Sequence, residues 1–112
     1  MAATRQTPTS RSTDVTVVPS GAALGAEVRG VDLRALDYET FALIHQAWLD
    51  HQVLLVRDQQ LRDDDLIAFS RRFGHLDEAP IQETGRRFVE GRPEIYVVSN
   101  VIENGVAIGS LG

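Results

Sequence analysis

His75 and Asp77 form an H-x-D pair, in which an imidazole and a carboxylate are close enough to share a metal ion. As iron ligands they would need a third partner, yet no histidine follows His75 in the chain. The remaining histidines, His45 and His51, are six residues apart on an expected helix and so face different directions. Because a helix C-terminus favours a cationic side chain, we expect His75 to be structural and the pair not to bind iron.

Two groups of acidic residues could bind a cation or transfer protons. Asp63 to Asp65 are consecutive at the expected start of a helix, where carboxylates interact favourably with the helix dipole, so we expect a solvated cap. Asp77 and Glu78 could act as acid and base, but nothing around them marks a catalytic pair, and we expect a charged loop.

The composition excludes several classes of protein. The 112 residues suffice for one domain or part of one, and no apolar run approaches the about 18 residues of a membrane span. The net charge of −5 leaves no basic footprint for nucleic acid. The absence of cysteine excludes disulfides, thiolate metal sites and cysteine nucleophiles, and is compatible with the cytoplasmic location that we expect.

The first residues differ from the rest of the chain. Residues 1–13 are rich in Ser, Thr and Arg, contain no acid and lack the apolar region of a secretory signal. An organelle transit peptide shares this composition, but we expect residues 1–14 to be a disordered tail and residues 15–112 to form the domain.

Two strands and a helix are expected next. Residues 14–19 alternate weakly and end at a proline, which suits an edge strand, and residues 24–31 predict a second strand. Asp37 is a suitable N-cap for a helix over residues 38–50. The apolar positions that should pack this helix on a sheet are Phe41, Ile44 and Trp48, with Leu43 and Ala47 beside them.

The second half continues in the same way. Four consecutive apolar residues, Val53 to Val56, predict a strand buried on both faces. The helix that begins at Asp63 should end at Gly74 as its C′ residue, with an inward stripe of Leu66, Phe69 and Phe73. Residues 77–93 predict a loop, residues 94–100 a third strong strand, and residues 103–108 a turn that returns as a hairpin.

Three segments carry a resemblance to a known family: LGAEVRGVDL (24–33), HQVLLVRDQ (51–59) and FSRRFGHL (69–76). They resemble the amino-terminal part of the taurine-dioxygenase-like (TauD/TfdA) family of non-haem iron oxygenases, over roughly residues 15–112. The resemblance implies an α+β class: the helix-and-strand part of a double-stranded β-helix (jelly-roll) fold, with the barrel incomplete in this chain.

The same resemblance implies the chemistry. Such enzymes hold Fe(II) with an H-x-D pair and a distal His, and bind alpha-ketoglutarate through a later Arg; this ligand set leaves open positions for the keto acid and oxygen. The parent enzyme would hydroxylate a small anionic organic substrate, releasing succinate and CO2. No H-x-D follows residue 100, so we expect the metal ligands beyond Gly112 and no catalytic or cofactor-binding residue in this chain. The isolated chain should then bind neither cofactor.

Two residues are expected at a substrate pocket. Taurine-type members place a His before a Pro in the loop after RFG, whereas Ala79 precedes Pro80 in this chain, which argues against taurine. Asn100 ends the segment that leads towards the active-site mouth in the family; alternatively it only turns the chain.

A different class of function remains open. The chain could be a catalytically inactive truncated product, or a small non-enzymatic binding module that keeps the helices and sheet. Both helices and the strand at 53–56 carry apolar faces that need partner surfaces, so self-association is also expected. Neither nucleic acid nor a membrane is an expected partner.

Overall fold

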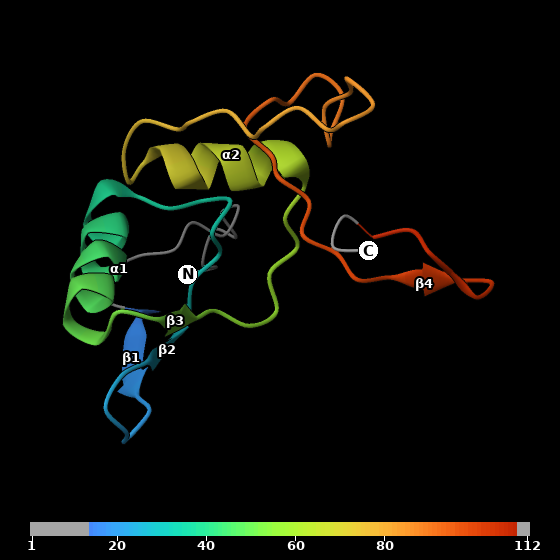
Figure 1. The fold of residues 1–112 in the computed structure, drawn as a ribbon. Helices are drawn as coiled ribbons and strands as arrows, with labels where there is room; N and C mark the ends of the chain where they lie inside the picture. The colour runs from blue at the N-terminus through green and yellow to red at the C-terminus, as the bar shows by residue number, and fades with distance from the viewer. Residues whose placement is uncertain (1–13, 110–112) are drawn as a thin grey trace, which may run out of the picture. The chain divides into compact units, whose positions relative to one another are not determined.

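The computed structural model describes residues 14–109, and the chain divides into two compact units. The first unit ends at Asp65 and the second begins at Leu66 (Figure 1). The expected tail, apart from Asp14, lies outside the described residues.

The first unit is built on a three-stranded sheet. Its strands are β1 (Thr16–Pro19), β2 (Ala26–Arg29) and β3 (Leu54–Leu55), in the order β1-β2-β3. β1 pairs antiparallel with β2, and β2 pairs parallel with β3 (Figure 1). The predicted edge strand ending at Pro19 is confirmed, since proline is tolerated where no neighbour needs its missing N–H.

Two glycines set the limits of β2. The Gly25 N–H donates to the His51 carbonyl at 2.8 Å, which joins the start of β2 to the end of the helix. At the other end, Gly30 has φ +82°, and a Cβ there would overlap the backbone carbonyl of Asp14. The sequence prediction of a strand interrupted by these glycines is therefore confirmed, and Gly30 is required by both its φ and its close approach.

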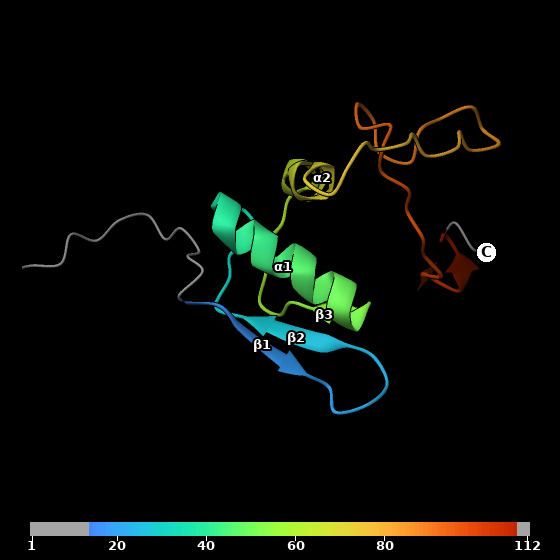
Figure 2. The ribbon, with the colours of Figure 1, turned by 90° about the vertical axis from the view of Figure 1, so that its left-hand side faces the viewer.

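Helix α1 (Tyr38–His51) lies across one face of this sheet, as Figure 2 shows. Its predicted cap is confirmed, because the Asp37 side chain accepts a hydrogen bond from the Thr40 N–H at 2.7 Å. The helix ends at His51 and is capped by Gln52, whose φ is 72° and whose N–H donates to the Trp48 carbonyl. None of the described helices is long and apolar enough to cross a membrane.

The predicted apolar stripe of α1 is confirmed at Ile44 and Ala47 but not at Trp48. The buried residues of the helix are Thr40, Ile44 and Ala47, whereas Trp48 is 43% exposed. The rings of Phe41 and Trp48 instead flank His45, with centroids 6.0 and 5.9 Å away. Ile44 is the largest of the fully buried side chains, and it shares the core with Ala26 and Val28 of β2. The helix is thus turned so that its aliphatic residues and Thr40, and not its aromatic ones, are buried.

The strand predicted at Val53 to Val56 is shorter and more exposed than expected. β3 contains only Leu54 and Leu55, while Val53 and Leu55 are 55% and 46% exposed. The prediction of burial on both faces is therefore wrong for the described residues. The reason is cover: α1 packs on one face of this sheet, so β3 side chains that point to the other face stay exposed.

Helix α2 (Asp63–Arg71) begins where it was predicted. The Asp65 carboxylate accepts from the Arg62 N–H at 2.9 Å, which caps the helix in the manner of a capping box. The inward stripe is again offset: Ile67 is buried and Leu66 is 45% exposed. The regular helix ends at Arg71, three residues before Gly74, whose N–H donates to the Arg71 carbonyl.

The second unit ends in a short hairpin of β4 (Ile102–Glu103) and β5 (Val106–Ala107). Asn104 and Gly105 have φ of 51° and 77°, as a two-residue type I′ turn requires, so the predicted hairpin is confirmed. The strand predicted over residues 94–100 is wrong, because this segment forms no strand. Its Ile95 N–H donates to the Arg92 carbonyl in a turn, and Val98 is 67% exposed. A strand needs a neighbouring strand to share a ladder of backbone hydrogen bonds, and in the sheets of the described residues no strand pairs with this segment.

Candidate functional site

Gln59 links two segments of the first unit that are distant in sequence. Its Oε1 accepts from the Leu33 N–H at 2.9 Å. Its Nε2 donates to the carbonyls of Val31 and Arg57, both at 3.0 Å. One side-chain amide therefore supplies partners for three backbone groups, and the role of Gln59 in this unit is structural.

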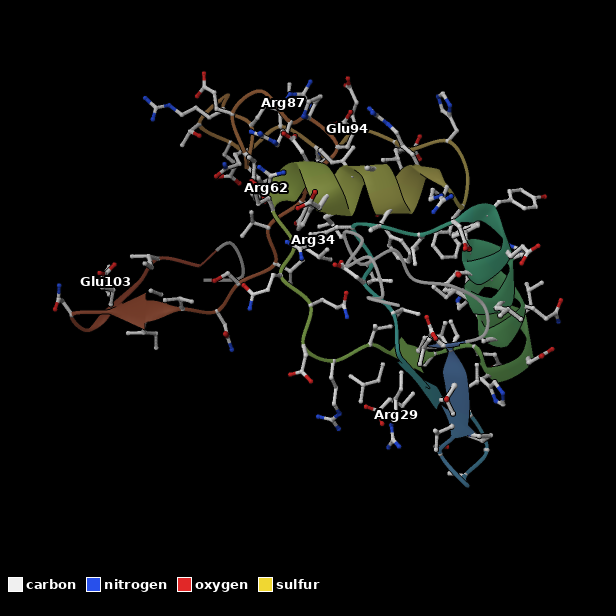
Figure 3. All side chains as sticks on the ribbon, turned by 180° about the vertical axis from the view of Figure 1, so that it is seen from behind. Arg29, Arg34, Arg62, Arg87, Glu94 and Glu103 are labelled. Carbon is white, nitrogen blue, oxygen red and sulfur yellow. The ribbon has the colours of Figure 1, made fainter. Side chains whose placement is uncertain are left out.

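Glu27 holds two arginines at the same edge of the sheet. Its carboxylate accepts from Arg29 Nε at 2.9 Å and from Arg57 Nε at 3.0 Å. The hydrogen bond from Arg29 is the largest cause of a lowered pKa at Glu27, and the charge of Arg57 adds to it. Figure 3 labels Arg29, which extends from β2.

A shallow hollow of about 310 Å³ lies beside this cluster. The cationic side chains that line it, Arg29 and Arg57, are matched by the carboxylates of Glu27 and Asp58. Because the charges balance, the hollow offers no excess of positive charge to an anion, and we assign these residues to the scaffold.

The acidic run at Asp63 to Asp65 acts as a helix cap. The pKa of Asp65 is lowered, chiefly by the hydrogen bond from the Arg62 backbone N–H. A similar pair lies in the loop between β2 and α1, where the side chain of Arg34 lowers the pKa of Asp32 by donating to it. In both pairs an arginine from the same stretch of chain partners the carboxylate, which is typical of local ion pairs on a surface.

The structure leaves the H-x-D pair without further ligands nearby. His75 and Asp77 are both exposed, and residues 14–109 contain no group of three or more His, Asp or Glu that could hold a metal ion. His45 lies between two rings on α1, and His51 ends that helix. The described residues therefore do not fit an iron site. That the pair is structural stays a prediction.

Ala79 lies inside the packing of the 77–93 loop. It is 9% exposed, its N–H donates to the Pro93 carbonyl at 2.7 Å, and its carbonyl accepts from Arg87 Nη1 at 3.0 Å. Both backbone groups of Ala79 are thus held by residues from the far end of the loop.

Arg87 is the residue that sequence reasoning missed. Besides Ala79, its guanidinium donates to the Glu78 carboxylate at 3.2 Å, and its own carbonyl accepts from Gln82 Nε2. The signal that could have indicated such a clamp is loop length, since long connections without secondary structure are uncommon unless they are ordered by their own side chains.

Further contacts hold the residues that follow the 77–93 loop. Arg71 on α2 donates to the Glu94 carboxylate at 2.9 Å, and the rings of Phe88 and Tyr96 lie 4.5 Å apart. Figure 3 shows Arg87 and Glu94 in the part of the chain that follows α2. The predicted loop is therefore confirmed as irregular but is extensively hydrogen-bonded.

Asn100 is exposed and lies apart from this network. Among residues 14–109 no hydrogen bond joins its side chain to the 77–93 loop. Its neighbours make a local turn, in which the Val101 N–H donates to Ser99 Oγ at 3.3 Å. The same segment lies close to Gly109, and the Val101 carbonyl accepts from the Ile108 and Gly109 N–H groups.

Comparison with known proteins gives one consistent result. Residues 16–110 match the family model described as taurine catabolism dioxygenase TauD, TfdA family. An (S)-phenoxypropionate/alpha-ketoglutarate-dioxygenase of Delftia acidovorans is 38% identical over 83% of this chain and 28% of its own length. A pentalenolactone F synthase of Streptomyces avermitilis is 39% identical over 89% of this chain and 32% of its own length.

Solved structures agree with the sequence matches. A taurine dioxygenase from Burkholderia xenovorans superposes with a TM-score of 0.65 and 34% identity, covering 80% of this chain and 31% of that one. A second protein from the same organism, provisionally described as an alpha-ketoglutarate-dependent taurine dioxygenase, gives a TM-score of 0.67 and 36% identity over the same shares of the two chains. The chain therefore spans less than a third of the length of each of these four relatives.

Proposed function

The chain belongs to the TauD, TfdA family, and on that premise we propose that it is the amino-terminal part of an iron- and alpha-ketoglutarate-dependent dioxygenase. The enzyme would decarboxylate the keto acid to succinate and CO2 while it hydroxylates a small anionic organic substrate. The observation that carries the proposal is the family match over residues 16–110. Relatives named as dioxygenases, with identities of 34–38%, support it.

In this proposal the described units are scaffold, and the catalytic groups come from sequence beyond Gly112. The jelly-roll barrel, the iron ligands and the Arg for the keto acid would all lie there. The absence of a cluster of three metal-ligating side chains within residues 14–109 supports this division. The isolated chain would then bind neither Fe(II) nor alpha-ketoglutarate. A cytoplasmic location is part of the same proposal.

The proposed substrate is a small organic acid other than taurine. Ala79 supports this choice, because its methyl group can donate no hydrogen bond to a sulfonate and its backbone N–H is already bonded to Pro93. The Delftia relative is named for phenoxypropionate, a carboxylic acid. We assign Ala79, and Asn100 with it, to the edge of the substrate pocket.

Succinate release tests the proposal. The encoded full-length protein should form succinate from alpha-ketoglutarate when Fe(II), oxygen and an aryloxy carboxylic acid such as phenoxypropionate are supplied. Taurine should support little turnover, and the 112-residue chain should support none. Reactions without Fe(II) are the control. Iron-dependent succinate from the purified 112-residue chain, or none from the full-length protein with a panel of organic acids, would contradict the proposal.

A further inference from the structure

We propose that Arg87 is a positioning residue for substrate binding, because it fixes the backbone of the loop at Ala79. The inference rests on the proposed function, in which Ala79 borders the substrate pocket. It adds a residue that was not among the candidates from the sequence, and a way in which the loop acquires a defined shape.

The first step is the geometry of the guanidinium. Nη1 donates to the Ala79 carbonyl at 3.0 Å and Nη2 to the Glu78 carboxylate at 3.2 Å. A planar guanidinium presents its donors as a fork, so one side chain can hold two acceptors on adjacent residues. The Arg87 side chain is 33% exposed, which limits competition from water for these bonds. The charged donor makes them stronger than bonds between neutral groups.

The second step is the position of Arg87 itself. Its carbonyl accepts from Gln82 Nε2 at 3.2 Å, and the Gln82 N–H donates to the Arg86 carbonyl at 3.0 Å. The Gly85 N–H donates back to Gln82 at 2.8 Å, which completes a tight turn. The backbone at Arg87 is therefore already held by hydrogen bonds. Placing the Arg87 side chain against Ala79 then costs less conformational entropy than it would from a backbone that was not held.

The third step concerns Ala79. Pro93 accepts its N–H, and Arg87 donates to its carbonyl, so both contacts come from the returning part of the loop. Without Arg87 the carbonyl would lose its protein partner, and the bond from the Ala79 N–H to Pro93, which holds the preceding peptide unit, would be left to fix this residue. Since displacement of a positioning group by about 1 Å can lower catalytic efficiency by about a hundredfold, the clamp should affect substrate binding.

The loop can be tested apart from catalysis by limited proteolysis. A glutamate-specific protease can cut after Glu78, Glu83 and Glu90 within the loop and after Glu103 in the hairpin, and arginine substitutions leave these four glutamates in place. Arg87→Ala should accelerate cleavage at Glu83 and Glu90 by about tenfold, with Glu103 as an unchanged internal reference. Arg87→Lys should give an intermediate rate, because an ammonium keeps the charge but not the fork.

Arg86→Ala is the matched control. The side chain of Arg86, next to Arg87 in the sequence, makes no hydrogen bond to the loop among residues 14–109. Only the backbone carbonyl of Arg86 takes part, as the acceptor of the Gln82 N–H. Arg86→Ala should therefore cleave like the unchanged chain. If Arg87→Ala and Arg86→Ala behave alike, Arg87 does not clamp the loop and the inference is overturned.

Steady-state kinetics of the encoded full-length protein tests the link to substrate. Arg87→Ala should raise KM for the organic acid by about tenfold or more and leave KM for alpha-ketoglutarate unchanged, with Arg87→Lys between the two. A purely structural loss would instead lower the active fraction and leave both KM values alone. Unchanged KM for the organic acid in an active Arg87→Ala enzyme would overturn the positioning role. Absence of succinate from the unsubstituted protein would contradict the proposed function, and with it the role in substrate binding, while proteolysis still decides whether the clamp exists.

Discussion

Arg57 and Glu27 are joined across the first unit, with Arg57 Nε 3.0 Å from Glu27 Oε2, although they are 30 residues apart in sequence. Glu27 belongs to LGAEVRGVDL and Arg57 to HQVLLVRDQ, two of the segments that carry the family resemblance. Gln59, from the second segment, bonds to Val31 and Leu33 of the first. The residues that identify the family in this chain therefore hold each other in place.

Replacing Gln59 should destabilise the first unit. Gln59→Ala removes the partners of the Leu33 N–H and of the Val31 carbonyl, and unsatisfied backbone groups cost about 1–3 kcal/mol. The change should appear as a lower urea midpoint with an unchanged slope. Gln60→Ala, on an exposed neighbour, is the control and should change the midpoint little. Equal effects of the two substitutions would contradict the bridging role of Gln59.

The stabilisation of α1 by Asp37 should come from its side-chain oxygen as an N-cap and not from its negative charge. Asp37→Ala removes the acceptor of the Thr40 N–H and should lower the free energy of unfolding by about 1 kcal/mol. Asp37→Asn keeps a side-chain oxygen in place and should retain most of the stability, since Asn is an equally good N-cap. Helical circular dichroism during urea unfolding measures both. A loss in Asp37→Asn as large as in Asp37→Ala would show that the charge matters more than the cap.

Stability should fall in acid. Hydrogen bonds from Arg29, Arg34 and Arg62 lower the pKa values of Glu27, Asp32 and Asp65 respectively. The folded state therefore binds fewer protons than the unfolded state in acid. The stability contributed by these groups is fully present above the ordinary carboxyl pKa of about 4 and is lost as pH falls through the lowered values.

Urea unfolding at pH 6 and pH 3 checks this dependence on pH. Glu27→Gln should show a smaller loss between the two than the unchanged chain, and 1 M salt should reduce the difference because these pairs are exposed to solvent. Asp58→Asn removes a carboxylate that takes part in no ion pair among the described residues, and should leave the loss unchanged. An identical loss in Glu27→Gln would contradict the contribution assigned to Glu27.

The H-x-D pair should not create a metal site in this chain. Anaerobic calorimetric titration with Fe(II), or with Mn(II) as a surrogate, should show no stoichiometric site of micromolar affinity. His75→Ala should give the same weak, nonspecific heat, because residues 14–109 offer no third ligand near the pair. A stoichiometric site that disappears in His75→Ala would show that the pair does bind metal.

The exposed edge strand should promote self-association of the isolated chain. Val53 and Leu55, at β3, are more than 40% exposed, and a strand with a free edge can pair with another chain. Leu55→Lys should shift sizing chromatography towards the monomer, whereas Thr16→Lys, which places the same charge on β1, should do so less. A strictly monomeric chain with a sharp, cooperative unfolding transition would instead favour the small binding module.

Local signals predicted the fold where a few neighbouring residues decide it. Asp37 capped its helix, Gly25 and Gly30 limited β2, and Asn104-Gly105 formed its hairpin turn, as expected. Each of these features depends on the φ or the hydrogen bonds of adjacent residues, which composition and spacing reveal.

Predictions of burial and strand pairing failed where they depend on which other elements lie beside a segment. Val53 to Val56 read as a fully buried strand, and residues 94–100 as a strong one, because apolar β-branched residues favour strands wherever a neighbour exists. In the sheets of the described residues β3 pairs with one strand and residues 94–100 with none. The bonds of Arg87 and Gln59 were missed for a related reason: polar side chains that bridge distant backbone groups leave no periodic pattern.

The sheet of the first unit also sets an order of events during synthesis. The strand pairings of β1, β2 and β3 and the bonds of Gln59 all join residues between Thr16 and Gln59, so they can form before Leu66 is made. Ribosomes add about 5–20 residues per second, and amino-terminal units tend to fold first. This unit can therefore assemble at the ribosomal exit while later residues are still being translated. The nascent chain would present β3 as a preformed edge to whatever emerges next.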